Sequence, residues 1–363
     1  MESSLQIEVT PNADPVSPAR LAEILAAPGF GKHFTDHMLT VEWTPALGWH
    51  DARITAYGPL SLDPATAVLH YAQEIFEGMK AYRHADGTVW TFRPEENAAR
   101  MLRSAQRLAL PGLPVPDFIA AVDATIAADE RWVPEPAGEK SLYVRPFMFA
   151  SEAFLGVRPS QHVTFMVICS PAGAYFSTGV HPVSIWLSEH YTRAGRGGMG
   201  AAKTGGNYAS SLVAQQEAIE EGCDQVVFLD SAQGRYVEEL GGMNLYFVQD
   251  DGTIVTPETS GTILEGITRS SLIELCGKLG HPVEERPVTL DEWRDGVASG
   301  RIAEVFACGT AAVVTPVGTL KWRGGQVGDG ESTGPITQEV RSALVDIQYG
   351  RAEDTFGWMH RVC

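Results

Sequence analysis

The sequence predicts a two-domain protein of the α+β (mixed α/β) class. Its 363 residues exceed one ordinary hydrophobic core, so two domains of roughly 150–200 residues are expected. β-Rich runs and segments of helical periodicity occur in both halves. A small, turn-rich segment, PAGAYFSTG, separates the halves. We therefore expect a small N-terminal domain over 1–170, a linker over 171–180, and a larger C-terminal domain over 181–363.

Composition indicates a globular protein without nucleic-acid or membrane partners. Hydrophobic residues make up 44% and charged residues 20% of the chain, and the formal net charge is -18. No run of Lys and Arg offers the basic stripe that a duplex or an anionic membrane requires. The five cysteines lie far apart without a CxxC motif, which argues against a disulfide framework and a metal site. With no signal-like N-terminus or membrane span, the expected location is the cytoplasm.

The first half contains strand-like runs and two helical patterns. Strands are expected from His37 and from Arg53, followed by a hairpin that turns at Asp86-Gly87. A helix should begin at Pro94, which suits a first helical turn. Four residues then fall on one helical face: Met101, Ala105, Leu108 and Ala109. A second helix is expected over 116–132, and the apolar runs SLYVRPFMFA and HVTFMVICS are predicted to be buried strands.

The second half opens with a strand, VSIWLSE, which a glycine-rich loop follows. After this loop we expect a helix over ASSLVAQQEAIEEG and a strand over DQVVFLD. A hairpin is predicted around Asp251-Gly252, and the helix TRSSLIELCGKLG begins directly after Gly266. The run EVFACGTAAVVTPV is predicted to be a last strand with a small-residue turn at its centre.

The glycine-rich loop, RAGRGGMGAAKTGGNY, contains the chemically informative lysine of the chain, Lys203. Six glycines surround it, which suggests close backbone approach to another group. An NTPase phosphate loop ends in GK followed by Ser or Thr, but Ala202 stands where that glycine is required. The alternative is a lysine activated for Schiff-base chemistry. Composition alone favours an ordinary solvated lysine over a phosphate-loop lysine and over a Schiff-base lysine.

The flanking segments resemble the branched-chain amino acid aminotransferases, pyridoxal-phosphate enzymes of fold type IV. The segment GGMGAAKTGGNYASSLVAQQEAIEEGCDQVVFLD matches the cofactor-lysine segment of that family. Seven further strings match in the family's order: FEGMKAYR, RMLRSAQRL, LYVRPF, LGVRP, VEELGGMN, LEGITR and FACGTAAVVTPV. The resemblance runs from about residue 70 to 316, and it implies a two-domain enzyme with the cofactor, pyridoxal 5'-phosphate, between the domains.

The resemblance implies roles for individual residues. Lys203 would be the catalytic residue that holds the cofactor and moves the substrate proton. Glu239 would face the pyridine nitrogen and keep it protonated, so that the ring acts as an electron sink. Tyr208 would donate a hydrogen bond to the cofactor's phenolic oxygen. The cofactor phosphate would be bound by five residues: Arg100, Gly266, Ile267, Thr268 and Thr310. The predicted helix start at 266–268 is an anion site on physical grounds as well.

Substrate selection is expected to be apolar. Phe76, Tyr143 and Ala311 would line the side-chain pocket, and Arg145 would accept the second carboxylate of glutamate. Three residues would come from the partner subunit of a homodimer: Tyr71, Leu155 and Val157. The substrate carboxylate would meet the backbone of Thr310 and Ala311. Without the resemblance, each apolar residue would be read as ordinary core packing.

Two departures from the family pattern stand out. Gly242 occupies a position where some members carry threonine, so we expect a wider pocket and a less sharp preference among the branched substrates. Ala312 and Thr315 replace a CxxC found in some members, so no thiol switch is expected there.

The resemblance implies ping-pong transamination of leucine, isoleucine or valine with 2-oxoglutarate, giving branched 2-oxo acids and glutamate. D-amino acid aminotransferase and aminodeoxychorismate lyase share the fold, the lysine and the glutamate, but FEGMKAYR and LYVRPF favour the branched-chain activity. A nucleotide-binding ATPase and a non-catalytic relative are the alternatives of another class. The ATPase would be colourless and would bind ATP with magnesium, and the intact Lys203, Tyr208 and Glu239 count against the non-catalytic relative.

Overall fold

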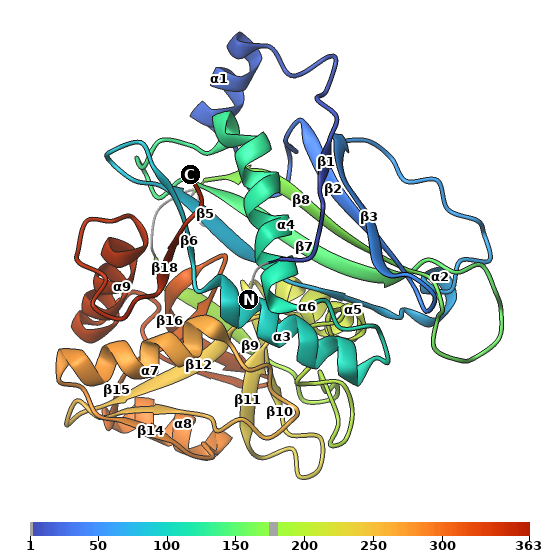
Figure 1. Cartoon of the computed structure of the whole chain (residues 1–363). Coiled ribbons are helices and arrows are strands. Elements are labelled where there is room, and N and C mark those ends of the chain that lie inside the picture. Colours follow the sequence, from blue (N-terminus) through green and yellow to red (C-terminus); the bar gives the residue numbers. More distant parts are fainter. Residues whose placement is uncertain (1–2, 174–180) are drawn as a thin grey trace. The chain divides into compact units, whose positions relative to one another are not determined.

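The computed structural model describes residues 3–173 and 181–363. The chain divides into two compact units, each with its own sheet. The first unit comprises Met1–Ser177, Ala202–Gly205 and Ile347–Cys363, and the second comprises Thr178–Ala201 and Gly206–Asp346. Both units mix helices with sheets that are largely antiparallel, as the predicted α+β class requires (Figure 1).

This division differs from the predicted one in two segments. The segment Ala202–Gly205, with Lys203, belongs to the first unit because it hydrogen-bonds to residues of that unit. The C-terminal segment also returns to the first unit, where its last strand pairs with an early hairpin. As a result the N-terminal unit, predicted to be the small one, is the larger. Of the predicted linker, Pro171 and Ala172 are strand residues, and 174–180 lie outside the described residues.

The first unit is built on a sheet of the order β1-β3-β2-β8-β7-β5-β6-β18, with β4 paired to β7. Only the β1–β3 pair in this sheet, as described, is parallel. The strands are β1 (Glu8–Val9), β2 (His37–Thr44), β3 (Gly48–Ala56), β4 (Glu74–Phe76), β5 (Met79–Arg83), β6 (Val89–Phe92), β7 (Ser141–Ala150), β8 (Val163–Ala172) and β18 (Met359–Arg361). The helices are α1 (Pro18–Ala26), α2 (Val68–Tyr71), α3 (Pro94–Arg107), α4 (Val115–Ala128) and the 3-10 turn η1 (Glu130–Trp132).

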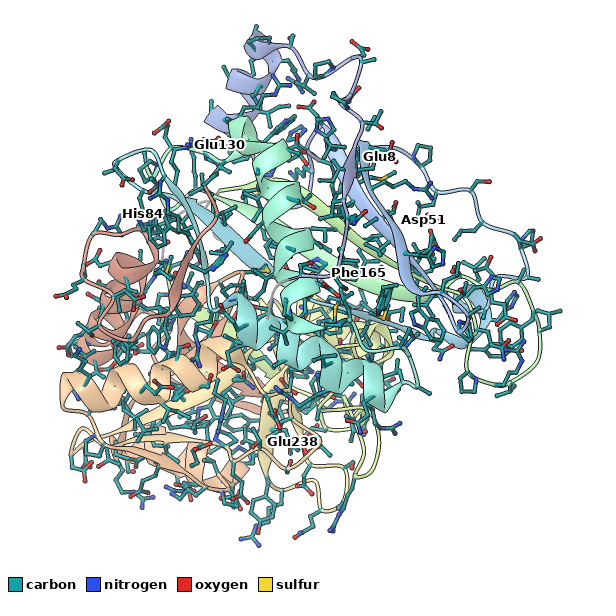
Figure 2. The ribbon with its side chains drawn as sticks, in the orientation of Figure 1. Glu8, Asp51, His84, Glu130, Phe165 and Glu238 are labelled. Carbon is teal, nitrogen blue, oxygen red and sulfur yellow. The ribbon has the colours of Figure 1, made fainter. Side chains whose placement is uncertain are left out.

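The core of the first unit lies where α4 packs on β2 and β8. Phe118 of α4 and Phe165 of β8 are both buried, with ring centroids 6.1 Å apart. Phe165 is labelled in Figure 2. The predicted helical face of α3 is confirmed for Met101 and Ala105, which are buried. Leu108 is the C-cap of α3 and packs partly buried against the same core, whereas the prediction was wrong for Ala109, whose backbone turns left-handed with φ of 52°. The predicted second helix ends at Ala128, and η1 follows it.

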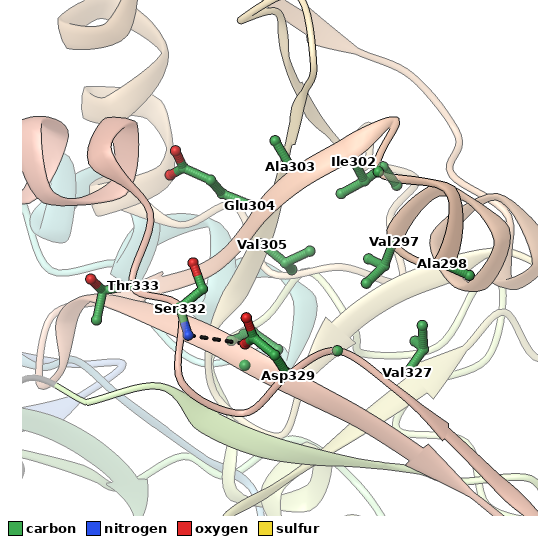
Figure 3. A pocket seen from close by; sticks show the side chains of 14 residues that line it. Val297, Ala298, Ile302, Ala303, Glu304, Val305, Val327, Asp329, Ser332 and Thr333 are labelled. Carbon is green, nitrogen blue, oxygen red and sulfur yellow. Dashed lines mark hydrogen bonds between the residues drawn. The ribbon is translucent and has the colours of Figure 1, made fainter.

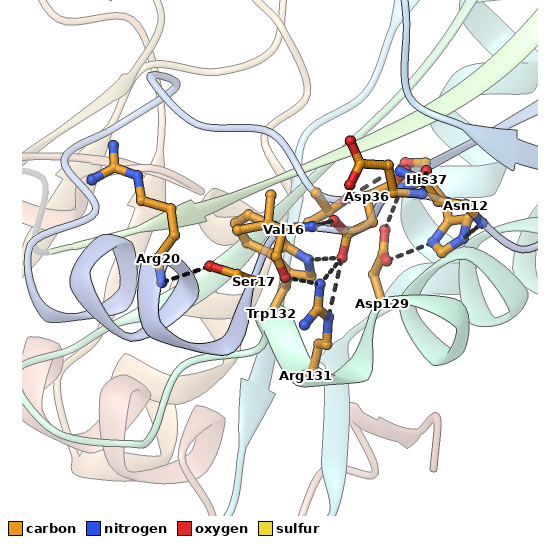
Figure 4. A network of polar contacts seen from close by, with 11 residues as sticks. Asn12, Val16, Ser17, Arg20, Asp36, His37, Asp129, Arg131 and Trp132 are labelled. Atoms are coloured by element: carbon orange, nitrogen blue, oxygen red, sulfur yellow. Dashed lines mark hydrogen bonds and ion pairs between the residues drawn. The ribbon is translucent and has the colours of Figure 1, made fainter.

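A buried polar network ties the N-terminal segment to this core (Figure 4). Asp36 accepts hydrogen bonds from Trp132 Nε1 at 2.6 Å, from Arg131 Nη2 at 2.6 Å and from the Val16 amide at 2.8 Å. Burial alone would raise the pKa of Asp36, but these hydrogen bonds and the Arg131 charge lower it below its usual value. The network therefore fixes the chain before α1 through donors that satisfy a buried carboxylate.

The second unit contains a sheet of the order β11-β10-β9-β16-β15-β12-β13-β14, with β17 paired to β16. The strands are β9 (Val183–Leu187), β10 (Gln225–Leu229), β11 (Val237–Leu240), β12 (Asn244–Gln249), β13 (Ile254–Thr256), β14 (Val283–Glu285), β15 (Ile302–Gly309), β16 (Val313–Trp322) and β17 (Gly325–Val327). The helices are α5 (Gly205–Ala209), α6 (Leu212–Glu220), α7 (Ile267–Leu279), α8 (Leu290–Ser299) and α9 (Pro335–Gln348), of which the first residue of α5 and the last two of α9 belong to the first unit. The predicted last strand is two antiparallel strands, β15 and β16, because the small residues at its centre make a reversal.

Candidate active site

The segment of Lys203 is held on the first unit by contacts on both sides of the lysine. The Lys203 amide donates to Ser104 Oγ of α3 at 3.0 Å, and its carbonyl accepts from the Phe76 amide of β4 at 3.0 Å. The Lys203 Nζ lies 4.7 Å from the centroid of the Phe76 ring. The backbone of the predicted catalytic lysine is thus fixed by β4 and α3, and its amine lies against an aromatic face.

Arg100 lies one helical turn before Ser104 on α3, so both side chains project from the same helix face. Its guanidinium is buried and forms a forked ion pair with Glu77: Nε to Oε1 and Nη2 to Oε2 are both 2.8 Å. Asn97 donates to the same carboxylate at 2.8 Å. This pairing explains how an arginine is tolerated in a buried place. Its predicted phosphate contact stays a prediction.

The three pocket residues predicted on the first unit lie together. Arg145 Cζ lies 4.8 Å from the Phe76 ring centroid and 5.3 Å from that of Tyr143, and Arg145 Nη2 donates to the Tyr143 hydroxyl at 3.1 Å. Gly78 is required here, because a Cβ would lie 2.1 Å from the Tyr143 oxygen. Phe30, which the sequence did not single out, packs edge-on against Tyr143. One wall is therefore aromatic and carries the Arg145 guanidinium.

The three residues predicted to act on a partner subunit form a separate exposed group. Val157 is 89% exposed, Leu155 65% and Tyr71 39%. The Tyr71 hydroxyl donates to the Leu155 carbonyl, which joins the two segments. The structure records no contact between this group and Lys203 among the described residues.

Glu239 lies on β11 in the second unit and is almost completely buried. Its Oε1 is 2.8 Å from Arg193 Nη1 and accepts from the Leu264 amide at 2.8 Å. Arg193 also donates to the Thr262 carbonyl at 3.1 Å and is itself buried. Sequence analysis missed Arg193, although it stands at the start of the glycine-rich loop. The predicted carboxylate is thus oriented by a buried cation and a backbone donor.

The neighbouring Glu238, which is labelled in Figure 2, is buried as well but has different partners. It accepts from the Thr262 hydroxyl, and its pKa is raised because burial outweighs that hydrogen bond and the nearby Arg193 charge. The two adjacent glutamates therefore differ in their partners: Glu239 pairs with a buried arginine, whereas Glu238 accepts from a neutral hydroxyl.

Contacts within the second unit bring the other predicted residues near the β11–β12 turn. A Cβ on Gly242 would lie 3.7 Å from the Tyr208 ring, so a side chain at this position would touch the tyrosine. A Cβ on Gly309 would lie 3.5 Å from the Gly242 carbonyl, which places the following residues, Thr310 and Ala311, near the same turn. A larger residue at 242 would therefore narrow the space beside Tyr208.

The start of α7 also meets this turn. Asn244 donates to the Leu264 carbonyl at 3.1 Å, and a Cβ on Gly266 would lie 2.1 Å from Asn244 Oδ1. Gly266 is the N-cap of α7 and supplies no side-chain cap to the Ile267–Thr268 end. The first amides of a helix lack acceptors within the helix and attract anions.

These residues fit pyridoxal phosphate. In the first unit Lys203 presents an amine and Arg100 a guanidinium. In the second unit the start of α7 suits an anion such as a phosphate, and the buried Glu239 carboxylate suits a ring nitrogen. Among residues 3–173 and 181–363, no cluster of His, Cys, Asp and Glu has the arrangement of a metal site. In the same ranges, no helix is long and apolar enough to cross a membrane.

Two cavities of the second unit contain none of the predicted site residues. One, of about 390 Å³, is lined by parts of α8, β15, β16 and the segment before α9 (Figure 3). The other, of about 470 Å³, includes Glu238 and Thr262 in its lining. Neither cavity is therefore part of the predicted active site.

Comparison with known proteins decides the family. The model of the class IV aminotransferases matches residues 74–320. A probable branched-chain-amino-acid aminotransferase of Streptomyces coelicolor is 59% identical, covering 98% of both chains. The chain belongs to the branched-chain aminotransferase family of class IV. The corresponding aminotransferase of Mycolicibacterium smegmatis is 54% identical, covering 99% of this chain and 98% of that protein.

Solved branched-chain aminotransferases share the fold. The Thermobaculum terrenum enzyme, solved in its pyridoxal-phosphate form, is 26% identical with a TM-score of 0.72, covering 89% of this chain and 98% of its own. The Escherichia coli enzyme is 28% identical with a TM-score of 0.71, covering 90% of this chain and 99% of its own. The predicted family and fold type are therefore confirmed.

Proposed function

We propose that the protein transfers the amino group of L-leucine, L-isoleucine or L-valine to 2-oxoglutarate with pyridoxal phosphate as cofactor. The observation that carries this proposal is the aromatic wall of Phe76 and Tyr143 with Arg145, on the same unit as the anchored Lys203. An apolar side chain can pack on the rings, and a second carboxylate can meet the guanidinium.

Each half-reaction then needs few groups from the chain. When bound, the cofactor would supply an electron sink for the substrate Cα and a carrier for the amino group. The Lys203 amine would take the proton from Cα. Glu239 would hold a proton at the ring nitrogen, Tyr208 would donate to the phenolic oxygen, and Arg100 with the start of α7 would bind the phosphate.

The test is visible absorption of the purified protein supplied with pyridoxal phosphate. The band of the bound cofactor should fade when L-leucine is added alone and return with 2-oxoglutarate, because each half-reaction is complete in itself. A response to D-amino acids but not to L-leucine would contradict the substrate assignment. A colourless protein that binds ATP with magnesium would contradict the cofactor assignment.

We also propose that the protein works as a homodimer in a reducing compartment, the cytoplasm. The exposed Leu155 and Val157 support the dimer, since large exposed apolar groups mark interaction surfaces. All five cysteines are free thiols, four of them buried, which suits a reducing environment.

Co-expressed subunits test the dimer. A Lys203→Ala chain and a Val157→Asp chain should each be inactive or nearly so alone, whereas mixed dimers should regain activity. The reason is that one site in a mixed dimer would combine an intact Lys203 with the partner's intact Val157. Light scattering should show twice the chain mass of 39.2 kDa. No recovery on mixing, or a monomer at working concentration, would contradict the proposal.

A further inference from the structure

Glu74, to which the sequence assigned no role, contacts the residues directly after Lys203. This half-buried residue opens β4, two positions before Phe76. Its Oε1 accepts from the Gly205 amide and, at 3.3 Å, from the Thr204 hydroxyl. Both donors directly follow Lys203. With the Ser104 and Phe76 contacts, the backbone is therefore held at the lysine and directly after it.

The sequence of the loop matches this contact. A Cβ on Gly205 would lie 2.5 Å from Glu74 Oε1 and 3.3 Å from its carboxyl carbon, so only glycine lets the carboxylate approach the amide. Gly205 of the glycine-rich loop thus leaves room for the Glu74 carboxylate to accept a hydrogen bond from its amide. A carboxylate is a stronger acceptor than a neutral oxygen, which suits a segment that must stay in one place.

Burial raises the pKa of Glu74 above its usual value, and the Gly205 and Thr204 donors and the Arg145 charge offset only part of that shift. Arg145 and Glu74 therefore stabilise each other within the first unit. Gln73, the neighbour on the chain, has different partners: its side chain donates to the Leu108 carbonyl at 2.9 Å and to the Ala109 carbonyl.

We propose that Glu74 is a positioning residue for Lys203: its carboxylate anchors the Thr204–Gly205 backbone and so sets where the lysine amine points. The inference rests on the proposed role of Lys203 and adds a residue that does not itself touch the substrate. Because β4 contributes both Glu74 and Phe76, a single strand fixes the loop and the surface against which the amine lies.

Hydrogen exchange of the cofactor-free protein tests the anchor directly. In Glu74→Ala the Gly205 amide should exchange at least about tenfold faster than in the wild type, because its acceptor is gone. The Lys203 amide should change less, since Ser104 still accepts from it. In the matched control Gln73→Ala, exchange at Gly205 should stay within about twofold. Equal exchange at Gly205 in wild type and Glu74→Ala would overturn the proposal.

Kinetics of the cofactor-loaded enzyme test the consequence. Glu74→Ala should lower kcat for L-leucine roughly tenfold to hundredfold with KM nearly unchanged, since a displaced amine costs rate and not binding. Glu74→Gln keeps an acceptor oxygen and should restore most of kcat. Equal losses in both variants, or a loss confined to KM, would overturn the positioning role.

A further variant covers the case that Glu74→Ala does not fold. Gly205→Ala should push the carboxylate away and give the same kcat loss with the same KM. Unchanged kcat in Gly205→Ala would count against the anchor. Failure of the proposed function would look different, because the wild-type enzyme itself would then not react with L-leucine.

Discussion

Replacing Lys203 with alanine should abolish the reaction with L-leucine, lowering kcat by at least about 10⁴-fold. The loss should be this large because a bound cofactor without its lysine lacks the group that takes the Cα proton. The fold should persist, since the contacts to Ser104 and Phe76 use backbone atoms that alanine also has. Single-turnover absorption after adding L-leucine measures the effect.

The matched control is Lys140→Ala. Lys140 also belongs to the first unit, but its amine donates to the carbonyls of Leu25 and Ala26, both at 2.9 Å. This variant should keep the visible band and the leucine reaction within about twofold, because its lost contacts stabilise only the end of α1. A Lys203→Ala enzyme that still turns over at a tenth of the wild-type rate would contradict the assignment.

The sequence proposed candidate site residues but did not show the network that orients them. Lys203 and Glu239 were found through motifs, because motifs are local strings. Their supports lie far away along the chain: Ser104 is 99 residues from Lys203, and Glu74 is 131 residues from Gly205. Hydrogen bonds over such separations leave no periodic signal in a single sequence, so these contacts could not be predicted.

The length of an element decides whether the sequence predicts it. Long periodic segments such as α3 and α7, and continuous apolar runs such as β7 and β8, carry enough residues to show a pattern. β4, β14 and β18 have three residues each, too few for any period. The missed β18 explains why the C-terminal segment was assigned to the second domain, because its pairing with β6 is visible only in the fold.

Replacing Glu239, one of two adjacent glutamates on β11, should give the second large loss of activity. Glu239→Gln should lower kcat/KM for L-leucine about 10²–10³-fold, because an amide cannot hold a proton at the ring nitrogen as a carboxylate does. It should also destabilise the fold by about 3–5 kcal/mol, since Arg193, whose side chain is 2% exposed, would lose its counter-charge. Urea unfolding and steady-state kinetics measure the two losses separately.

Glu238→Gln is the matched control on the same strand. Burial raises the pKa of Glu238, so folding favours its protonated form and a neutral isostere should change stability by no more than about 1 kcal/mol. The direction of the pH dependence can be tested. The raised pKa of Glu238 stabilises the folded wild type in acid, where the group is protonated, and this stabilisation is lost as pH rises and the group ionises. The variant should therefore gain stability relative to the wild type on going from acid to neutral pH.

Removing both partners separates stability from catalysis at Glu239. The double variant Arg193→Met, Glu239→Leu leaves no unpaired buried charge, so it should recover much of the stability that Glu239→Gln loses. Recovery should be incomplete, because the Thr262 carbonyl also loses its donor. Activity should not return, since the double variant still lacks a carboxylate for the ring nitrogen. If activity rose together with stability, Glu239 would be a structural partner of Arg193 and not a group that acts on the cofactor.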